Sequence, residues 1–332
     1  MLRRTLLGAV TALAVSAATA IAAENKPAIV FDIGGKFDKS FNESMFNGAE
    51  TFKAESGIAY GEFEIANEAQ REQAIRNFAD QGYSPIIAAG FAQAAAVEKV
   101  AKEYPELKFA IVDMVVDLPN VQSIVFKEHE GSYLVGLLAG MASKTAKVGF
   151  VGGMDIPLIR KFACGYAQGV KAAKPDATIF QNMTGDTGAA WSDPVKGGEI
   201  TKGQMAQGAD VIYAAAGATG LGVLQAAADG GALSIGVDAN QNFLHPGKVL
   251  TSMLKRVDVA VFNVMKNGND AFQPGIQVLG LAEDGAGYAM DENNRPLVTA
   301  EMQAAAEKAK ADIISGAIKV HDYTTDNTCP VQ

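Results

Sequence analysis

The sequence predicts an α/β protein with two lobes, each a parallel sheet flanked by helices. Its 332 residues correspond to about two domains, and 48% hydrophobic with 20% charged residues is the balance of a globular chain. Short apolar runs alternate with amphipathic stretches, which is typical of parallel sheets covered by helices. The alternation restarts after residue 127, and many of the 35 glycines follow apolar runs, where strand-to-helix turns are tight.

The first run of alternation predicts five strands and three helices. The strands are short and mostly apolar, and the helices are indicated by apolar residues at helical spacing, such as Ala74, Ile75 and Phe78 on one face. In chain order the elements are strand 27–31, helix 40–53, strand 61–65, helix 68–81, strand 84–89, helix 92–103, strand 108–112 and strand 121–126.

The second run repeats this pattern. Its elements are helix 131–144, strand 148–151, a helix from 157, strand 178–180, helix 195–207, strand 211–213, helix 220–228 and strand 233–237. Asp155 is expected to cap the helix that starts at Pro157. That helix is expected to bury Leu158, Ile159, Phe162, Tyr166 and Val170. The rest is less regular, with strand 249–254, helix 257–266, strand 276–281 and helix 299–314, and we expect it to cross between the lobes more than once.

Residues 1–22 predict a cleaved secretory signal. Two arginines precede an uncharged run over 5–22, which ends in small residues at the positions that signal peptidase reads. The alternative is a transmembrane anchor, but alanine, threonine and serine dilute the run. No cysteine follows it, so a lipid anchor is not expected. We therefore expect a soluble exported protein, whose formal charge falls from −9 by two, to −11, when both arginines are removed.

Composition excludes several classes of function. A net charge of −9 argues against nucleic-acid binding, because phosphate backbones attract basic proteins. Three histidines and two cysteines leave too few ligands for zinc fingers or dense metal sites, and we expect no cofactor. The chain has neither a Walker A motif nor a G-x-S-x-G motif, and His129, His245 and His321 are too scattered for a catalytic triad.

The two cysteines leave a question open. Cys164 lies in a predicted helix and Cys329 near the C-terminus. An oxidising compartment would allow them to form a disulfide. The alternative is one buried thiol and one thiol in the tail, because the sequence does not give the Cα separation on which a bridge depends.

Three predicted strands end directly in a carboxylate. Asp32, Asp113 and Asp238 each follow an apolar run, and ligands of open α/β sheets bind beyond the carboxyl ends of strands. An ionised carboxylate only accepts hydrogen bonds, so such a cluster suits an uncharged ligand with hydroxyl or N–H donors, or a cation, and repels phosphate unless a cation intervenes. The alternative for each aspartate alone is a helix cap or a turn.

Two aromatic residues and a glycine-rich loop are further candidates. Phe41 follows the first strand and Trp191, the single tryptophan, lies among glycine, alanine, serine and aspartate. Flat rings at such places can stack on a nucleobase, and core packing is the alternative. Gly217 belongs to a glycine-rich stretch after strand 211–213, where the backbone either approaches a ligand or makes a packed turn. Its position late in the chain argues against a dinucleotide loop.

Several motifs together resemble those of the basic membrane protein family of periplasmic substrate-binding proteins, of the purine nucleoside receptor type. They stand at 38–42 (Asp-Lys-Ser-Phe-Asn), 150–153 with Pro157 and Phe162, 193–197, 215–220, 236–238 and 246–252 with Lys255. The resemblance covers essentially the whole chain after residue 22. It implies a type I two-lobed binding-protein fold with three crossovers. The lobes would comprise 23–127 with about 250–284, and 128–249 with about 285–332.

The resemblance also implies a role and a site. A monomer would bind a purine nucleoside, such as adenosine, inosine or guanosine, and deliver it to a membrane permease driven by an ATPase. Phe41 would stack on the base and Trp191, where the family usually has phenylalanine, on its other face. Asp113 and Asp238 would bind the ribose or base, Asp32 the base edge, and Gly217 and Lys255 would add a backbone and a polar contact. Asn42 closes the first motif and joins this set.

Some features depart from the family pattern and keep alternatives open. The chain lacks the lipobox cysteine of members that are lipoproteins, Ala218 replaces a frequent glycine, and Asn240 replaces a frequent aspartate. A flavin such as riboflavin is an alternative ligand, because a scaffold does not name its ligand. The alternative functions are a secreted nucleoside hydrolase that uses the aspartates and a ligand-binding partner of a chemoreceptor. We expect a binding protein and not an enzyme.

Overall fold

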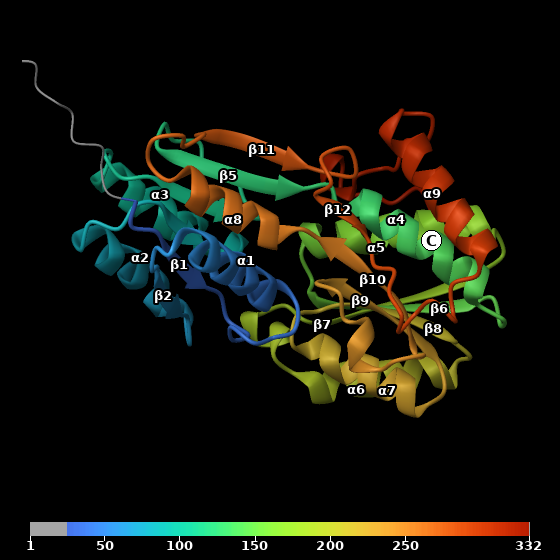
Figure 1. Ribbon diagram of the computed structural model, residues 1–332. Coiled ribbons are helices and arrows are strands. Elements are labelled where there is room, and N and C mark those ends of the chain that lie inside the picture. Colours follow the sequence, from blue (N-terminus) through green and yellow to red (C-terminus); the bar gives the residue numbers. More distant parts are fainter. Residues whose placement is uncertain (1–24, 332) are drawn as a thin grey trace, which may run out of the picture.

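Two six-stranded sheets organise residues 25–331, which the computed structural model describes, into two lobes (Figure 1). The expected signal segment, 1–22, lies outside the described residues. Each predicted helix and strand overlaps an observed element. The two-lobed α/β class predicted from the alternating pattern is therefore confirmed.

The first sheet has the strand order β11-β5-β4-β3-β1-β2, with every neighbouring pair parallel. Its strands are β1 (Ala28–Phe31), β2 (Gly61–Glu64), β3 (Ile86–Ala88), β4 (Phe109–Val112), β5 (Val121–Phe126) and β11 (Gly275–Leu279). Alternate residues of the central strands face opposite sides. Ile29 and Phe31 pack on α1 (Phe41–Ser56) and α8 (Val257–Asn267), whereas Val30 packs on α2 (Arg71–Asp80) and α3 (Ala94–Glu103).

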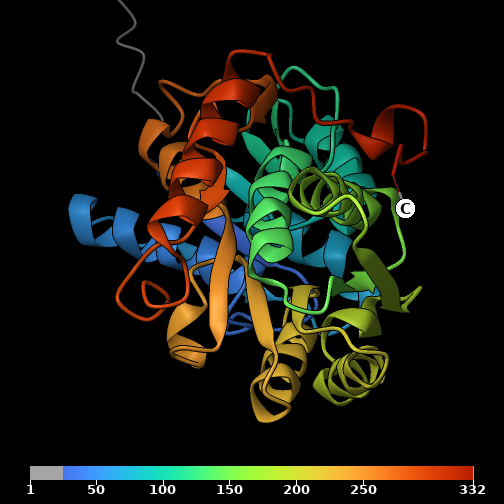
Figure 2. The ribbon, with the colours of Figure 1, turned by 90° about the vertical axis from the view of Figure 1, so that its right-hand side faces the viewer.

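The second sheet has the order β12-β10-β9-β8-β6-β7, and only its edge strand β12 is antiparallel. Its strands are β6 (Lys147–Met154), β7 (Thr178–Gly185), β8 (Val211–Ala215), β9 (Leu233–Asp238), β10 (Val249–Lys255) and β12 (Ala286–Tyr288). One face is covered by α4 (Glu128–Ala142), α5 (Pro157–Ala173) and α9 (Ala300–Ile314), and the other by α6 (Pro194–Ala206) and α7 (Thr219–Asp229). Figure 2 shows these two helical layers from the end of this lobe.

Within residues 25–331 the chain passes between the lobes three times, from β5 to α4, from β10 to α8 and from β11 to β12. The expected boundary near residue 250 is wrong in one respect. β10 pairs with β9, so residues 250–255 belong to the second sheet and the return to the first lobe comes at Arg256. An apolar run predicts a strand, but the sheet it joins depends on non-local pairing.

Two helix starts differ from the sequence prediction. Ile156, and not Asp155, occupies the cap position of α5, while the Asp155 carboxylate accepts hydrogen bonds from the Arg160 guanidinium at 2.7 and 2.8 Å. α4 begins at Glu128, ahead of the predicted residue 131. Acidic residues in a first turn interact favourably with the helix dipole. This earlier start brings Glu128 to the junction between the lobes.

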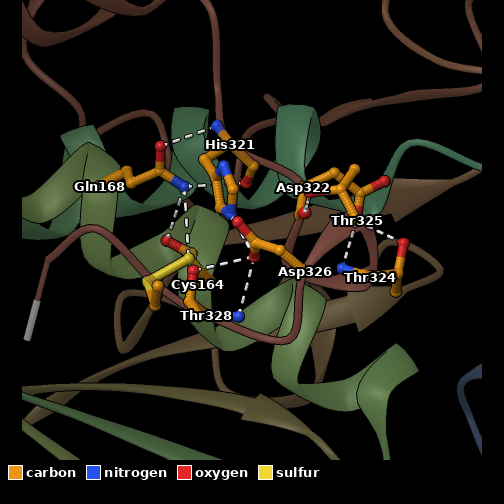
Figure 3. Close-up of a disulfide and its surroundings, with 9 residues drawn as sticks. Cys164, Gln168, His321, Asp322, Thr324, Thr325, Asp326 and Thr328 are labelled. Atoms are coloured by element: carbon orange, nitrogen blue, oxygen red, sulfur yellow. Dashed lines mark hydrogen bonds and ion pairs between the residues drawn. A yellow bond between two sulfur atoms is a disulfide. The ribbon is translucent and has the colours of Figure 1, made fainter.

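The two cysteines form a disulfide that fixes the C-terminal segment to α5 (Figure 3). The Cα atoms of Cys164 and Cys329 are 5.6 Å apart, which is a normal separation for a bridge. Beside it, the Gln168 side chain donates to the carbonyl of His321 at 3.0 Å and accepts from its N–H at 2.8 Å. The open question about the cysteines is thus answered in favour of the bridge.

Candidate ligand-binding cleft

A cleft of about 620 Å³, mouth included, lies between the lobes at the carboxyl ends of both sets of strands. The cleft is lined by residues of both lobes, among them all eight sequence-predicted candidates: Asp32, Phe41, Asn42, Asp113, Trp191, Gly217, Asp238 and Lys255. The structure therefore brings together residues that are more than two hundred positions apart in the chain.

Two aspartates stand at strand ends in different lobes, and each faces the opposite lobe. Asp113 follows β4 and Asp238 ends β9, and both have left-handed backbone conformations, with φ of 70° and 64°. Burial raises the pKa of each carboxyl to about 6, although Lys255 lowers both. Both carboxylates line the cleft, where a ligand could donate hydrogen bonds to them.

Lys255 is buried, with 1% of its surface exposed, and it bridges the lobes. Its ammonium lies 2.6 and 2.7 Å from the two carboxylate oxygens of Asp113 and 3.0 Å from Oε1 of Glu128. Burial lowers the pKa of Lys255, but the nearby carboxylates outweigh this effect and raise it above its usual value. Lys255 is therefore a cation that balances the buried acids, in addition to a polar group in the cleft wall.

Glu128 and Lys161 extend this charge cluster behind the cleft wall, and the sequence analysis missed both. The Lys161 ammonium lies 2.9 Å from Oε2 of Glu128 and donates to the carbonyl of Phe126 at 2.7 Å. Burial raises the pKa of Glu128, but Lys255 and Lys161 outweigh it and the pKa is lowered. The sequence signal for Glu128 is an acidic residue just before predicted helix 131–144. Because the helix was predicted to start at residue 131, Glu128 was not recognised as part of its first turn.

Asp32 is held in place by its own lobe. The Arg71 guanidinium lies 3.1 Å from Oδ1, which also accepts the N–H of Ile33 at 2.8 Å, and burial raises the pKa of the carboxyl. A Cβ on Gly90 would come within 2.9 Å of Oδ2, so a side chain there would crowd the carboxylate. Asn42 accepts the backbone N–H of Asp32 at 3.1 Å and donates to its carbonyl at 3.2 Å. Its amide thus serves to position Asp32.

Asp38 organises the loop that enters the cleft. Its carboxylate accepts the backbone N–H groups of Ser40, Asn42 and Glu43 at 2.8–3.1 Å, which fixes the start of α1. The Ser40 hydroxyl can then donate across the cleft to Oδ2 of Asp238 at 2.5 Å. The Gln241 amide donates to the carbonyl of Lys39 at 2.9 Å. The lobes are therefore in contact through this loop as well as through Lys255.

Trp191 presents its ring from a rigid turn. The carbonyl of the preceding Ala190 accepts hydrogen bonds from the hydroxyls of Thr184 and Thr219 at 3.0 and 2.8 Å. A Cβ on Gly153 would lie 2.3 Å from the indole, so this glycine lets the ring rest on the end of β6. Gly217 has a φ of 55° and approaches the carbonyl of Trp191. Phe41 contributes the second ring, from the first turn of α1.

This arrangement combines flat apolar surface with carboxylate acceptors. It suits a planar heteroaromatic group that carries hydroxyl or N–H donors. In residues 25–331 no group of three or more histidine, cysteine or acidic side chains is arranged to hold a metal ion. Across the same residues, no helix has both the length and the hydropathy that a membrane crossing requires.

Comparisons with known proteins identify a family. Residues 26–324 match the family model Bmp, described as ABC transporter substrate-binding protein PnrA-like. The chain is 36% identical over 319 residues to the CD4+ T-cell-stimulating antigen of Listeria monocytogenes, covering 88% of this chain and 87% of that protein. It is 33% identical over 322 residues to the ABC transporter nucleoside-binding protein BmpA of Lactococcus lactis, covering 89% and 88%.

A solved structure agrees with the fold. The crystal structure of an ABC transporter solute-binding protein from Aeropyrum pernix superposes with a TM-score of 0.82 at 30% sequence identity, and the match covers 90% of this chain and 93% of that one. The likeness therefore extends over both lobes and not over one sheet alone.

Proposed function

Since the chain belongs to the Bmp family of PnrA-like ABC transporter substrate-binding proteins, we propose that it binds a purine nucleoside between its lobes and delivers it to a membrane permease. The observation that carries this proposal is the joint presence of Phe41, Trp191 and buried carboxylates in one cleft. The ring of a purine would stack on the aromatic side chains, at about 1–3 kcal/mol for each stacked base. The ribose hydroxyls and base N–H groups would donate to the acids.

The charge of the cleft supports a nucleoside over a nucleotide. Among residues 25–331, four aspartates line it (Asp32, Asp38, Asp113 and Asp238) together with one cation, Lys255, whose ammonium is already engaged by carboxylates. A phosphate would meet uncompensated negative charge, whereas neutral donors would be accepted. A ligand without such donors would remove water from the carboxylates and make no hydrogen bonds to them in return, which is the basis of selectivity.

The proposed location and partners follow from the family. We place the mature protein in the periplasm after removal of residues 1–22, as a monomer that meets an ABC permease and its ATPase. Closure of the lobes by hinge motion would exclude water from the ligand and create the surface that the permease recognises. The step involves binding only, and no bond of the nucleoside is broken.

Identification of the bound ligand tests the proposal. The mature protein is purified without added ligand and denatured, and the released small molecules are identified by mass spectrometry. Titration calorimetry with inosine, adenosine, guanosine and riboflavin then ranks affinities. We expect mass spectrometry to identify a purine nucleoside as the released ligand. In calorimetry, we expect one of the three purine nucleosides to bind more tightly than riboflavin. Riboflavin as the released and preferred ligand would overturn the nucleoside assignment, and release of free base during incubation would indicate a hydrolase.

A further inference from the structure

A row of charged side chains crosses the junction between the lobes, behind the cleft. It runs from Asp113 through Lys255, Glu128 and Lys161 to Asp322, and we call it the hinge charge row. Successive N–O distances along it are 2.6, 3.0, 2.9 and 3.5 Å. Asp113 and Lys255 line the cleft, but Glu128 does not. Glu128 is nevertheless as buried as Lys255, with 1% of its surface exposed.

The members of the row belong to different lobes. Asp113 follows β4 of the first sheet. Lys255 ends β10 of the second sheet, and Glu128 begins α4, which packs against β10. A rotation of one lobe on the other would therefore change the contact between Lys255 and Asp113. The same rotation would leave the contact between Lys255 and Glu128 intact, because both residues move with the second lobe.

We propose that Glu128 is a positioning residue, which holds the Lys255 ammonium so that it forms an interlobe latch with Asp113 and thereby sets the affinity of the cleft for its ligand. The part of the inference that concerns affinity rests on the proposed function. Lys161 occupies Oε2 of Glu128 and leaves Oε1 for Lys255. Lys161 thus orients the Glu128 carboxylate, and the other carboxylate oxygen contacts the Lys255 ammonium.

The latch is anchored on the outer side as well. The Asp322 carboxylate lies 3.5 Å from the Lys161 ammonium, and its segment is fixed to α5 by the Cys164–Cys329 disulfide and by Gln168 (Figure 3). Without Glu128, Lys255 would lose its fixed partner within its own lobe. The ammonium would then have Asp113 as its one close carboxylate partner. It would no longer be held in a fixed position relative to the second lobe, so its contact with Asp113 would not hold the two lobes together.

The test is a double-mutant cycle on the mature protein. Glu128→Gln, Asp113→Asn and the double variant are compared with wild type, with Glu128→Asp as the variant that keeps the charge. The matched control is Glu199→Gln, which removes an exposed ion pair with Lys202. Two quantities are measured, the radius of gyration of the ligand-free protein by small-angle X-ray scattering and the dissociation constant of inosine by calorimetry. Circular dichroism reports whether each variant is folded.

We expect Glu128→Gln to increase the radius of gyration and to weaken inosine binding at least tenfold. The double variant should open the lobes no further than the single ones, because residues of one network couple non-additively. Glu128→Asp should lie between wild type and Glu128→Gln, and Glu199→Gln should match wild type. Additive effects, or a wild-type radius in Glu128→Gln, would overturn the latch. If Glu128→Gln does not fold, the cycle with Glu128→Asp decides the same question. If the wild type binds no nucleoside, the proposed function is refuted but the latch is not. The radius of gyration of the ligand-free variants tests the latch independently of the ligand.

Discussion

The two lobes repeat one strand order and place an aspartate at the same strand end in each. The first sheet reads β2-β1-β3-β4-β5-β11 from one edge, and the second reads β7-β6-β8-β9-β10-β12 in the same sense. Asp113 after β4 and Asp238 at the end of β9 are equivalent in this correspondence. Both have a positive φ, both are buried, and burial raises the pKa of both to about 6. The shared fold therefore imposes the same backbone and electrostatic conditions on the two acids.

The neighbouring strands are where the lobes differ. Val112 pairs with Ile124 and Val237 pairs with Met253, so Phe126 at the end of β5 corresponds to Lys255 at the end of β10. The Lys255 ammonium lies 5.1 Å from the centre of the Phe126 ring. Each acid receives its main partner from the opposite lobe, since Asp113 meets the ammonium of Lys255 and Asp238 meets the hydroxyl of Ser40. The equivalent aspartates therefore make different interactions, because Asp113 forms an ion pair and Asp238 accepts a hydrogen bond from a neutral hydroxyl.

A second difference concerns the first strand of each lobe. β1 leads into Asp32, whereas β6 contains Gly152 and Gly153 near its end and supports the indole of Trp191. The equivalent site is a carboxylate in the first lobe and a flat ring in the second. The comparison teaches that the repeated strand order supplies equivalent positions, while each lobe fills the end of its first strand with a different kind of side chain.

The largest expected effect comes from removing the cation that the second lobe alone supplies. Lys255→Met should lower the free energy of unfolding by about 3–5 kcal/mol, because Asp113 remains buried without its counter-charge and Glu128 keeps only Lys161. Denaturant unfolding monitored by circular dichroism measures it. The control is Lys202→Met, which removes an exposed ion pair with Glu199 and should cost at most about 1 kcal/mol. Equal losses in both variants would contradict the assigned role of Lys255.

The next comparison separates the two equivalent acids. Asp113→Asn should weaken inosine binding by about 10- to 150-fold, since a charged hydrogen bond contributes about 1.5–3 kcal/mol and 1.4 kcal/mol corresponds to tenfold. Asp238→Asn should lie at the low end of this range, because Lys255 keeps both of its close carboxylate partners. Calorimetry with each variant measures the two losses. A larger loss for Asp238→Asn would reverse the ranking that the Lys255 contacts predict.

Local sequence patterns were sufficient to predict many of the residues that line the cleft. An apolar run followed at once by an aspartate predicted Asp32, Asp113 and Asp238 at strand ends, and all three line the cleft. The contact between Lys255 and Asp113 spans 142 positions, and no local pattern encodes it. Glu128 was missed because apolar periodicity marks the buried face of a helix and does not mark a buried charge at its first residue.

The same limit applies to the fold. Residues 249–254 were recognisable as a strand, but which sheet they join depends on pairing with β9. The disulfide between Cys164 and Cys329 spans 165 positions, so the sequence could only leave it open. Elements follow from the chain's local chemistry, whereas boundaries between lobes and ion pairs across them follow from the assembled topology.

The two aromatic residues give the third prediction, which tests whether stacking is shared by the lobes. Phe41→Ala and Trp191→Ala should each weaken inosine binding by about 5- to 150-fold, since one stacked base contributes about 1–3 kcal/mol. Trp191→Phe is the matched variant, because it keeps a flat ring and should retain most of the affinity. Gly153→Ala should mimic Trp191→Ala, since its Cβ would collide with the indole. Calorimetric affinities at one temperature measure all four. Unchanged binding by Trp191→Ala would remove the second lobe from the stacking site.

The last prediction is a dependence of affinity on pH. Burial raises the pKa of Asp113 and Asp238 to about 6, so both carboxylates are largely ionised at pH 7 and largely protonated at pH 5. A ligand that donates hydrogen bonds prefers the ionised form. Inosine affinity should therefore fall by about tenfold for each essential carboxylate between pH 7 and pH 5, because the ionised fraction falls by about that factor. Asp113→Asn should show a shallower fall than wild type in calorimetry at pH 5, 6 and 7.

The same two carboxyls affect stability in the opposite direction. A pKa raised on folding means that the folded chain binds the proton more tightly, so this contribution to the free energy of unfolding is complete below about pH 4 and is lost as pH rises through about 6. Glu128, whose pKa is lowered, opposes it by contributing stability above its unfolded value. Replacement of Asp113 by asparagine should remove part of the loss between pH 4 and pH 6 in denaturant unfolding. A stability profile unchanged by Asp113→Asn, beside an unchanged pH dependence of inosine affinity, would mean that Asp113 does not titrate in this range, and that Lys255 keeps it ionised throughout.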